Sequence, residues 1–251
     1  MRFVFVLLMV LGIVDLTSLP AQKKAKKGNL YGYLVVIDPG HGGTDPGSSR
    51  IHKGVRITED EYVYDVSLRV ARLIRKRDGI AKLTLTDGVG ERDIPANKIF
   101  PDSRTERFAL DGSIAKAGSS GLAKRVRYGN ALASKYPKLK KIWISIHFDV
   151  VGKLKSVHGI RIICTDEDGK MVKSLEASFA SVGRLRNRHP IVESGDRDHG
   201  MRRLYVLGSK NRIANRVLIE LGNFNNDLDV WRLRDPKVRE AYAQAIVRGL
   251  K

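Results

Sequence analysis

The sequence predicts one α/β domain built on a mostly parallel, twisted sheet of about six strands with helices on both faces. Short apolar runs of strand length alternate along the chain with amphipathic stretches of helical period, which is typical of this fold class. The 251 residues, 42% of them hydrophobic, suffice for one full core. The predicted strands are 33–37, 82–86, 141–146, 158–164, 204–208 and 216–221.

Four helices are predicted between and after these strands, at 59–77, 122–135, 170–187 and from Pro236 to about Gly249. Residues 59–77 place apolar side chains at spacings of three, four and seven, which suits a helix packed on a sheet. The last helix has Asp235 as its expected N-cap and Pro236 in its first turn.

Residues 88–121 fit neither pattern. They are rich in Gly, Pro, Asp and Ser, and only 106–110 could form a short helix. Because so long a connection in a compact domain is usually a functional lid or a mobile insertion, both remain open, and we favour the mobile insertion.

The first residues have the layout of a secretory signal peptide. Met1 and Arg2 precede an apolar run from Phe3 to Val14, and small residues follow. The run is shorter than the roughly 18 to 20 residues that span a bilayer, so we favour a signal peptide at 1–21 over a retained anchor. A basic tether at 22–32 and a catalytic domain at 33–251 would follow. We expect the protein to be exported to the periplasm or cell envelope, with no stable membrane span once the signal peptide is cleaved.

The formal net charge of +19 indicates an anionic partner, for which nucleic acid, anionic lipid and cell-wall polymer are candidates. The expected signal peptide, the scatter of Lys and Arg, and the lack of a recognition-helix or aromatic-platform motif argue against nucleic acid. Peptidoglycan, whose stem peptides carry free carboxylates, fits both compartment and charge. The one cysteine, Cys164, cannot close an intrachain disulfide and is expected to be a buried thiol.

Three apolar strands end in or next to an ionisable residue. VVIDPGH delivers His41, WISIH delivers His147, and VLIE delivers Glu220. If the strands are parallel, these groups meet at one rim, where functional groups gather in open α/β sheets. Two histidines and a carboxylate are the material of a catalytic zinc site, which takes three protein ligands and leaves one position for water.

The third protein ligand is sought at the start of helix 59–77. Thr58 and Glu61 have the spacing of a capping box, which gives Glu61 a structural role. Glu59 lies on the inward stripe of the helix, where its carboxylate can point over the rim of the sheet. We therefore favour Glu59 as the ligand, with Glu61 as the alternative.

The remaining candidates receive structural roles. Asp38 is expected to cap the loop after the first strand, and Asp45 with the Gly42–Gly43 pair to shape that loop. The other histidines lack a comparable context and are expected to be solvated or structural: His52, His158, His189 and His199.

The site residues belong to longer motifs in a recognisable order. These are VIDPGHGGTDPG, the Glu of ITEDE, LAKRVRYGNAL leading into ISIHFD, HGMRRLYVLGS, and RVLIELGNFNNDLD. Together they resemble the zinc-dependent N-acetylmuramoyl-L-alanine amidases of the amidase_3 type, and the resemblance runs from about Tyr33 to Leu250. It implies Zn²⁺ bound by His41, Glu59 and His147, with Glu220 as the catalytic acid/base.

The resemblance implies a peptidoglycan hydrolase. Zinc-activated water would cleave the amide bond between the lactyl group of N-acetylmuramic acid and L-alanine of the stem peptide. The alternative is a non-catalytic peptidoglycan-binding protein of the same fold, and a nucleic-acid binder is the least favoured class. We expect a monomer; an activator protein is conceivable, but the sequence does not identify one.

Overall fold

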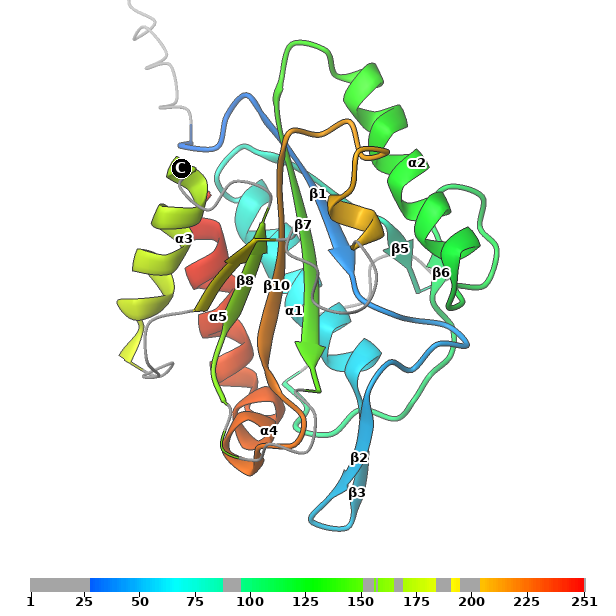
Figure 1. Ribbon diagram of the computed structural model, residues 1–251, viewed down its shortest axis with the longest axis vertical. Helices are drawn as coiled ribbons and strands as arrows, with labels where there is room; N and C mark the ends of the chain where they lie inside the picture. The colour runs from blue at the N-terminus through cyan, green and yellow to red at the C-terminus, as the bar shows by residue number, and fades with distance from the viewer. Residues whose placement is uncertain are drawn as a thin grey trace, which may run out of the picture.

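The computed structural model describes residues 28–87, 96–150, 156, 158–164, 169–183, 191–194 and 204–250. Its centre is a six-stranded sheet in the order β4-β1-β7-β10-β8-β9 (Figure 1). The first four strands are mutually parallel, β8 runs antiparallel to β10, and β9 is parallel to β8. The predicted, mostly parallel α/β fold is confirmed. The strands are β1 (Tyr33–Pro39), β4 (Ile80–Leu83), β7 (Lys140–Asp149), β8 (Arg161–Cys164), β9 (Ile191–Ser194) and β10 (Asn215–Asn223).

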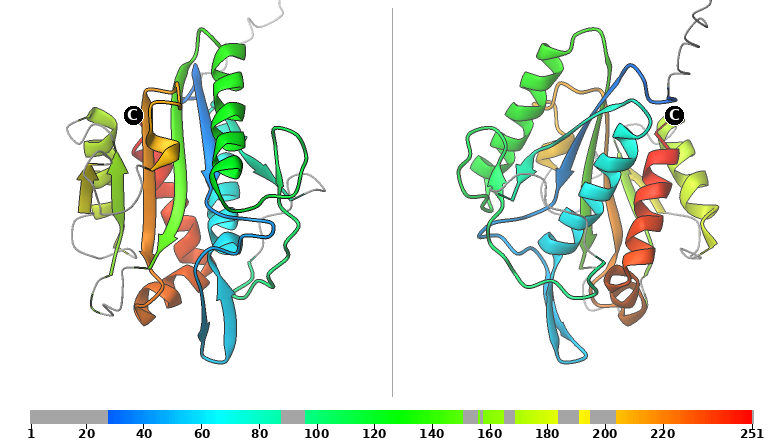
Figure 2. Two further views of the ribbon diagram at one scale, coloured as in Figure 1. Left: turned by 45° about the vertical axis from the view of Figure 1, so that its right-hand side comes forward. Right: turned by 180° about the vertical axis from the view of Figure 1, so that it is seen from behind.

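Helices cover both faces of the sheet (Figure 2). On one face lie α1 (Glu59–Arg75), α3 (Lys170–Ala180) and α5 (Pro236–Arg248), and on the other lie α2 (Ser119–Lys135) and the short 3₁₀ helix η3 (Tyr205–Leu207). Strand β1 is therefore buried on both sides. Val35 and Ile37 join the core under α1 and α5, while Leu34 and Val36 join the core under α2, as expected for a central parallel strand.

Three smaller elements complete the described chain. A hairpin of β2 (Ser49–His52) and β3 (Val55–Thr58) projects from the lower end in Figure 1. Strands β5 (Leu85–Thr86) and β6 (Arg107–Phe108) form a two-residue antiparallel pair, and α4 (Asp227–Arg234) precedes α5. As predicted, the side chain of Asp235 caps α5 by accepting a hydrogen bond from the Lys237 N–H.

Two predicted elements are wrong. Residues 204–208 are not a strand: they contain η3, whose Val206 and Leu207 pack in the core under α2. A short apolar run is buried in either conformation, so its pattern does not separate a strand from a turn of helix. The sixth strand is β9 instead, and α3 ends at Ala180 rather than at 187.

The described part of the predicted mobile insertion packs against the core of the domain. Phe100, Phe108 and Ala115 belong to the main core, and residues 119–121 already form the start of α2. Residues 96–121 therefore contribute to the core and to α2, and the choice between a lid and a mobile insertion stays a prediction. Residues 88–95 lie outside the described part of the chain.

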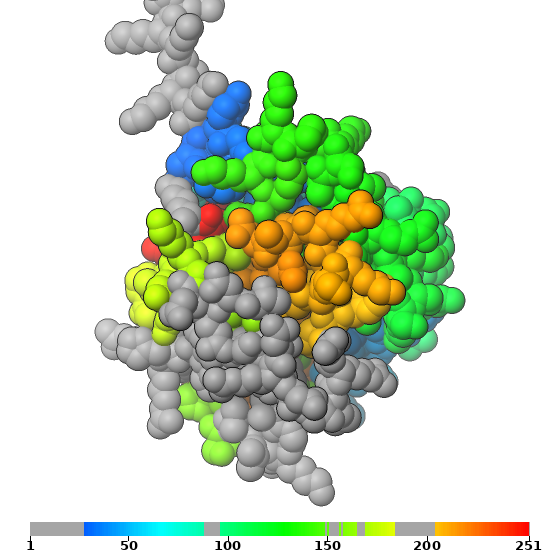
Figure 3. Space-filling model, turned by 45° about the horizontal axis from the view of Figure 1, so that its top comes forward, coloured from blue at the N-terminus to red at the C-terminus, as the bar shows by residue number. Residues whose placement is uncertain are grey.

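The end of the predicted basic tether also packs with the domain. Leu30 is fully buried, and its N–H donates to the Arg77 carbonyl. The Lys140 N–H donates to the Gly32 carbonyl at 2.9 Å, so the first described residues (blue) lie beside the green segment before β7 in Figure 3. Residues 28–32 of the predicted tether are therefore part of the packed domain. Residues 1–27, with the expected signal peptide at 1–21, lie outside the described ranges.

Cys164 is a buried free thiol, as predicted. Among the residues that the structure describes, no helix has the length and apolar character that crossing a bilayer requires.

Candidate metal centre

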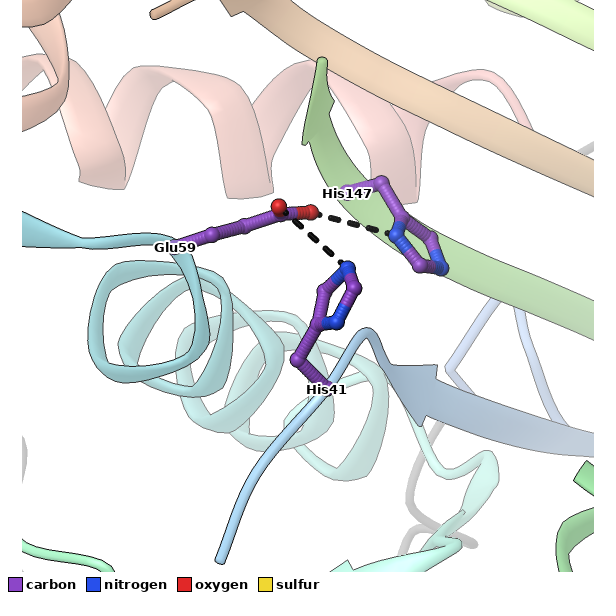
Figure 4. Close-up of side chains that lie close together, drawn as sticks. All are labelled: His41, Glu59 and His147. Carbon is purple, nitrogen blue, oxygen red and sulfur yellow. Dashed lines mark hydrogen bonds and ion pairs between the residues drawn. The ribbon is translucent and has the colours of Figure 1, made fainter. Parts of the chain in front are cut away.

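His41, Glu59 and His147 meet at the carboxyl ends of the parallel strands. His41 follows β1, His147 lies near the end of β7, and Glu59 is the first residue of α1. Strands β1 and β7 are parallel neighbours, which brings their ends to the same rim. One potential ligand atom from each residue lies within 4.8 Å of the others (Figure 4). Of the two glutamates considered as third ligand, Glu59 is the one beside the imidazoles.

The Glu59 carboxylate lies between the two imidazole rings. Its Oε2 is 3.3 Å from His41 Nε2, and its Oε1 is 3.1 Å from His147 Nδ1. The rings meet edge to face with their centroids 5.2 Å apart. Both nitrogens therefore point toward the same carboxylate, as the dashed lines in Figure 4 show.

Backbone groups fix this carboxylate in position. The Ser48 N–H donates to Oε2 and the Phe148 N–H to Oε1, each at 3.0 Å. Burial opposes ionisation of Glu59, but the imidazoles of His41 and His147 outweigh it and hold the pKa of this carboxyl well below its usual range. The side chain is thus a fixed, ionised ligand candidate.

The Asp45 carboxylate lies against the His41 ring. Its Oδ2 lies 3.1 Å from His41 Nδ1, and its Oδ1 accepts a hydrogen bond from the Gly47 N–H. Burial alone would lower the pKa of His41, but Glu59 and Asp45 together raise it to about 10. A carboxylate on one ring nitrogen leaves the other for a metal, a common arrangement around metal-bound histidines. The sequence pattern predicted only a loop-shaping role for Asp45. Its spacing of four residues from His41 was the signal that could have indicated the contact.

Arg125 holds the loop that carries His41. Its buried guanidinium donates through Nη1 to the Pro39 carbonyl at 2.5 Å and through Nη2 to the His41 carbonyl. His41 itself has a φ of 62°, a left-handed conformation that is uncommon outside glycine. The two carbonyl contacts therefore support a strained turn. This arginine belongs to the LAKRVRYGNAL motif, but the sequence pattern gave it no role of its own.

Asp38 has a different role from the predicted loop cap. Its buried carboxylate accepts from Arg125 Nη1 at 2.8 Å, from Thr84 Oγ1 at 2.6 Å and from Ser145 Oγ at 2.8 Å. These bonds tie α2, the end of β4 and β7 together beneath the His41 loop. Asp38 therefore supports the His41 loop from below through these side-chain contacts, instead of capping the loop after β1 as predicted.

A cavity of about 270 Å³ opens beside the imidazoles. Its lining comprises Asp38, Gly40, His41, Asp45, Lys116, Ala117, Gly118, Leu122, Arg125 and His147. A larger hollow of about 870 Å³ lies beside α1 and α5, and none of its lining residues belongs to the site. We regard the smaller cavity as the relevant one because it contains both histidines.

Glu220 lies on β10, directly paired with His147 on β7. Its side chain is partly buried, and its other cross-strand partner is Arg161 on β8. Glu220 is not one of the three clustered residues, but it occupies the same rim on the next strand.

The predicted capping box is wrong. Thr58 makes no side-chain cap, and the N–H groups of Glu59 and Asp60 donate instead to the carbonyls of Ser48 and Pro46. The Glu61 Oε1 accepts from the Ser103 N–H at 2.6 Å. Loop carbonyls therefore accept hydrogen bonds from the first N–H groups of α1. The carboxylates of the first turn are not needed as caps and make other contacts.

The other histidines stay outside the site. His52 is buried, lies 3.1 Å from Arg234 Nη1 and contacts the Trp231 ring edge to face. His158 is partly buried, and His189 and His199 lie outside the described residues. The structural role expected for His52 agrees with these contacts.

Known proteins share both sequence and fold with this chain. The sequence profile described as N-acetylmuramoyl-L-alanine amidase, amidase_3, matches residues 35–251. An uncharacterized cell wall amidase of Bacillus anthracis is 27% identical over 239 residues, covering 94% of this chain and 38% of that protein. The probable cell wall amidase LytH of Staphylococcus aureus is 25% identical over 232 residues, covering 92% of this chain and 62% of that protein.

The likeness extends to solved structures. N-acetylmuramoyl-L-alanine amidase AmiC2 of Nostoc punctiforme superimposes with a TM-score of 0.60 at 23% identity, covering 87% of this chain and 95% of that chain. At this identity the match establishes a common fold. The curated relatives are longer, and the chain spans less than two thirds of their length.

Proposed function

The chain belongs to the N-acetylmuramoyl-L-alanine amidase family, and on that premise we propose that it is a zinc-dependent peptidoglycan hydrolase. The bond cleaved would be the amide between the lactyl group of N-acetylmuramic acid and L-alanine of the stem peptide. The substrate, the metal and the roles of individual residues are parts of this proposal.

The observation that carries the proposal is the grouping of His41, Glu59 and His147. Two imidazole nitrogens and one carboxylate oxygen within 4.8 Å are the donor set of a catalytic zinc site. The Asp45 contact at His41 Nδ1 supports Nε2 as the atom that binds. The residues present therefore fit a zinc ion.

A bound zinc ion would supply Lewis acidity, lowering the pKa of a water molecule and polarising the substrate carbonyl. The chain itself must move the protons. Glu220 takes a proton from the attacking water and gives it to the amine nitrogen of L-alanine as the amide bond breaks. Its position beside His147 on the neighbouring strand supports this role.

Charge and surroundings support an anionic, extracytoplasmic substrate. The net charge of +19 favours a polymer whose stem peptides carry carboxylates, and Lys116 contributes a cation to the lining of the cavity. The relatives from Bacillus anthracis and Staphylococcus aureus are named as cell wall amidases. We therefore infer that the protein is exported and acts on the cell envelope.

Digestion of purified sacculi tests the function. The zinc-loaded protein should release stem peptides with a free L-alanine amino terminus from intact glycan strands, and a chelator should abolish their release. Mass analysis of the fragments separates this product from those of a carboxypeptidase or an endopeptidase. Sedimentation with sacculi in the absence of any new amino terminus, unchanged by the chelator, would instead support a non-catalytic binding protein.

A further inference from the structure

A second group of ionisable side chains lies apart from the three residues described above. Asp60, Glu61 and Glu106, which we call the acidic cluster, offer one carboxylate oxygen each within 4.8 Å of one another. All three residues are at most 2% exposed. Two come from the first turn of α1 and one from the chain just before β6, so the cluster joins segments that are distant in sequence.

Asp60 is the unusual member. Neither of its carboxylate oxygens has a hydrogen-bond partner among the described residues. The adjacent Thr58 hydroxyl is also buried without a partner, and it lies near Asp60 without meeting hydrogen-bond geometry. A buried carboxylate without hydrogen bonds is costly and rare in folded proteins, so this one calls for a ligand.

The other two carboxylates, Glu61 and Glu106, are held in place by hydrogen-bond donors of the chain. Glu106 accepts from the Gly43 N–H through Oε2 and from the Ser103 hydroxyl through Oε1, both at 3.0 Å. Glu61 accepts from the Ser103 N–H. A carboxylate has about four lone-pair positions, so the two contacts of Glu106 fix its side chain without exhausting its oxygens.

Charge at the cluster also favours a cation. Three carboxylates at this spacing repel one another strongly inside a protein. The start of a helix is favourable for anions, but two of its N–H groups already donate to the Ser48 and Pro46 carbonyls. Among the described residues, neither Asp60 nor Glu106 forms an ion pair with a Lys, Arg or His side chain.

We propose that Asp60, Glu61 and Glu106 bind one hard divalent cation of the calcium and magnesium class, at a site separate from His41, Glu59 and His147. The donors are all oxygen, which suits these ions, whereas nitrogen or sulfur donors would favour a transition metal. The Thr58 hydroxyl is a further oxygen within reach of Asp60. Water would complete the coordination.

This cation would brace the neighbouring site mechanically. It connects the first turn of α1, which begins with Glu59, to the Ser103–Glu106 segment. Glu106 in turn holds the Gly43 N–H in the loop that carries His41. One ion would therefore lock together the segments that position two of the three metal-ligand candidates.

The test uses the full chain carrying one zinc ion, dialysed against CaCl₂ or MgCl₂ at millimolar concentration. We expect about one additional Ca²⁺ or Mg²⁺ per chain by elemental analysis and a rise in the midpoint of thermal unfolding. Asp60→Asn and Glu106→Gln should each lose the additional ion and the rise while keeping zinc. Asp111→Asn is the matched control, because Asp111 is an acid of the same segment that pairs with Lys124 on the surface.

Three results would overturn the proposal. One is that the zinc-loaded wild-type chain binds no additional ion and its unfolding midpoint does not respond to either salt. Another is that Asp60→Asn binds the same number of ions as the wild type. The third is that Asp111→Asn loses the ion as well. If a variant fails to fold, the number of additional ions bound by the wild-type chain decides whether the site exists. None of these measurements depends on amide hydrolysis, so the proposed function is tested separately.

Discussion

Glu220 and His147 occupy paired positions on the parallel strands β10 and β7. Directly paired residues of neighbouring strands project from the same face of the sheet, so both side chains leave the sheet on the side covered by α2. Parallel pairing also places both at the carboxyl rim. This relationship supports the proposal that Glu220 transfers protons beside a metal ion that His147 helps to bind.

Glu220→Gln should separate catalysis from metal binding. The amide keeps the shape of the side chain but cannot accept and return a proton, so peptide release from sacculi should fall by about 100- to 10,000-fold. Zinc stoichiometry should stay unchanged, since Glu220 is not one of the three clustered residues. Glu176→Gln on α3 is the control carboxylate. Near-normal peptide release by Glu220→Gln would refute the assignment.

Gly40→Ala should disturb His147 directly. A Cβ at Gly40 would lie 2.5 Å from His147 Cε1 and Nδ1, and the Gly40 N–H is bonded to the Ile146 carbonyl, so the backbone cannot retreat easily. Overpacking of this kind costs about 1–3 kcal/mol, and the imidazole must turn away from Glu59. We expect weaker zinc binding in competition with a chelating dye.

The control for that substitution is Gly183→Ala, where an added Cβ meets no atom of the described residues within 4 Å and φ is not in the left-handed region. It should leave zinc affinity and the unfolding midpoint at wild-type values. Equal zinc affinity in Gly40→Ala and the wild type would mean that the position of the His147 ring is irrelevant to metal binding.

Arg125→Lys should weaken metal binding through the His41 loop. Lysine keeps a positive charge for Asp38 but lacks the planar fork that reaches the Pro39 and His41 carbonyls. Zinc affinity should fall by about 10- to 100-fold, as is typical when the support of a metal ligand is removed. Arg127→Lys, an exposed change on the same helix, is the control. If stability falls while zinc affinity is unchanged, Arg125 has only a structural role.

Much of the fold and site follows from local sequence patterns. The alternation of apolar runs with helical stripes is a local signal, and it predicted the parallel sheet and most helices. His41 and His147 could be placed together because strand direction alone sends their side chains to one rim. The resemblance to a known family selected the same residues.

Other features depend on contacts between distant segments. Arg125 lies 84 residues from His41, and its role appears only once α2 packs beside the loop after β1. The Glu61 contact with Ser103 replaces the expected capping box for the same reason, because tertiary partners outcompete a local motif. Strand β9 completes the sheet through pairing with β8, which the apolar pattern alone did not reveal.

His52 should make stability depend on pH. Burial, together with the cations of Arg234 and Arg50, lowers its pKa from 6.5, and the Asp227 carboxylate opposes this only in part. The unfolded chain therefore binds the proton more readily than the folded chain. The free energy of unfolding should decrease as pH falls through about 6.5, the usual pKa of histidine.

His52→Gln removes the titrating group while keeping a polar partner for Arg234. Urea unfolding of both proteins between pH 5 and pH 8 should give a shallower acid-side slope for the variant. Identical slopes would show that His52 takes up its proton equally well in the folded and unfolded states.

The location of the zinc ion tests the central claim most directly. Anomalous diffraction at the zinc edge from crystals of the zinc-loaded protein should place the strongest peak between His41 Nε2, His147 Nδ1 and the Glu59 carboxylate. A strongest peak at any other position, with the two imidazoles away from it, would contradict the account.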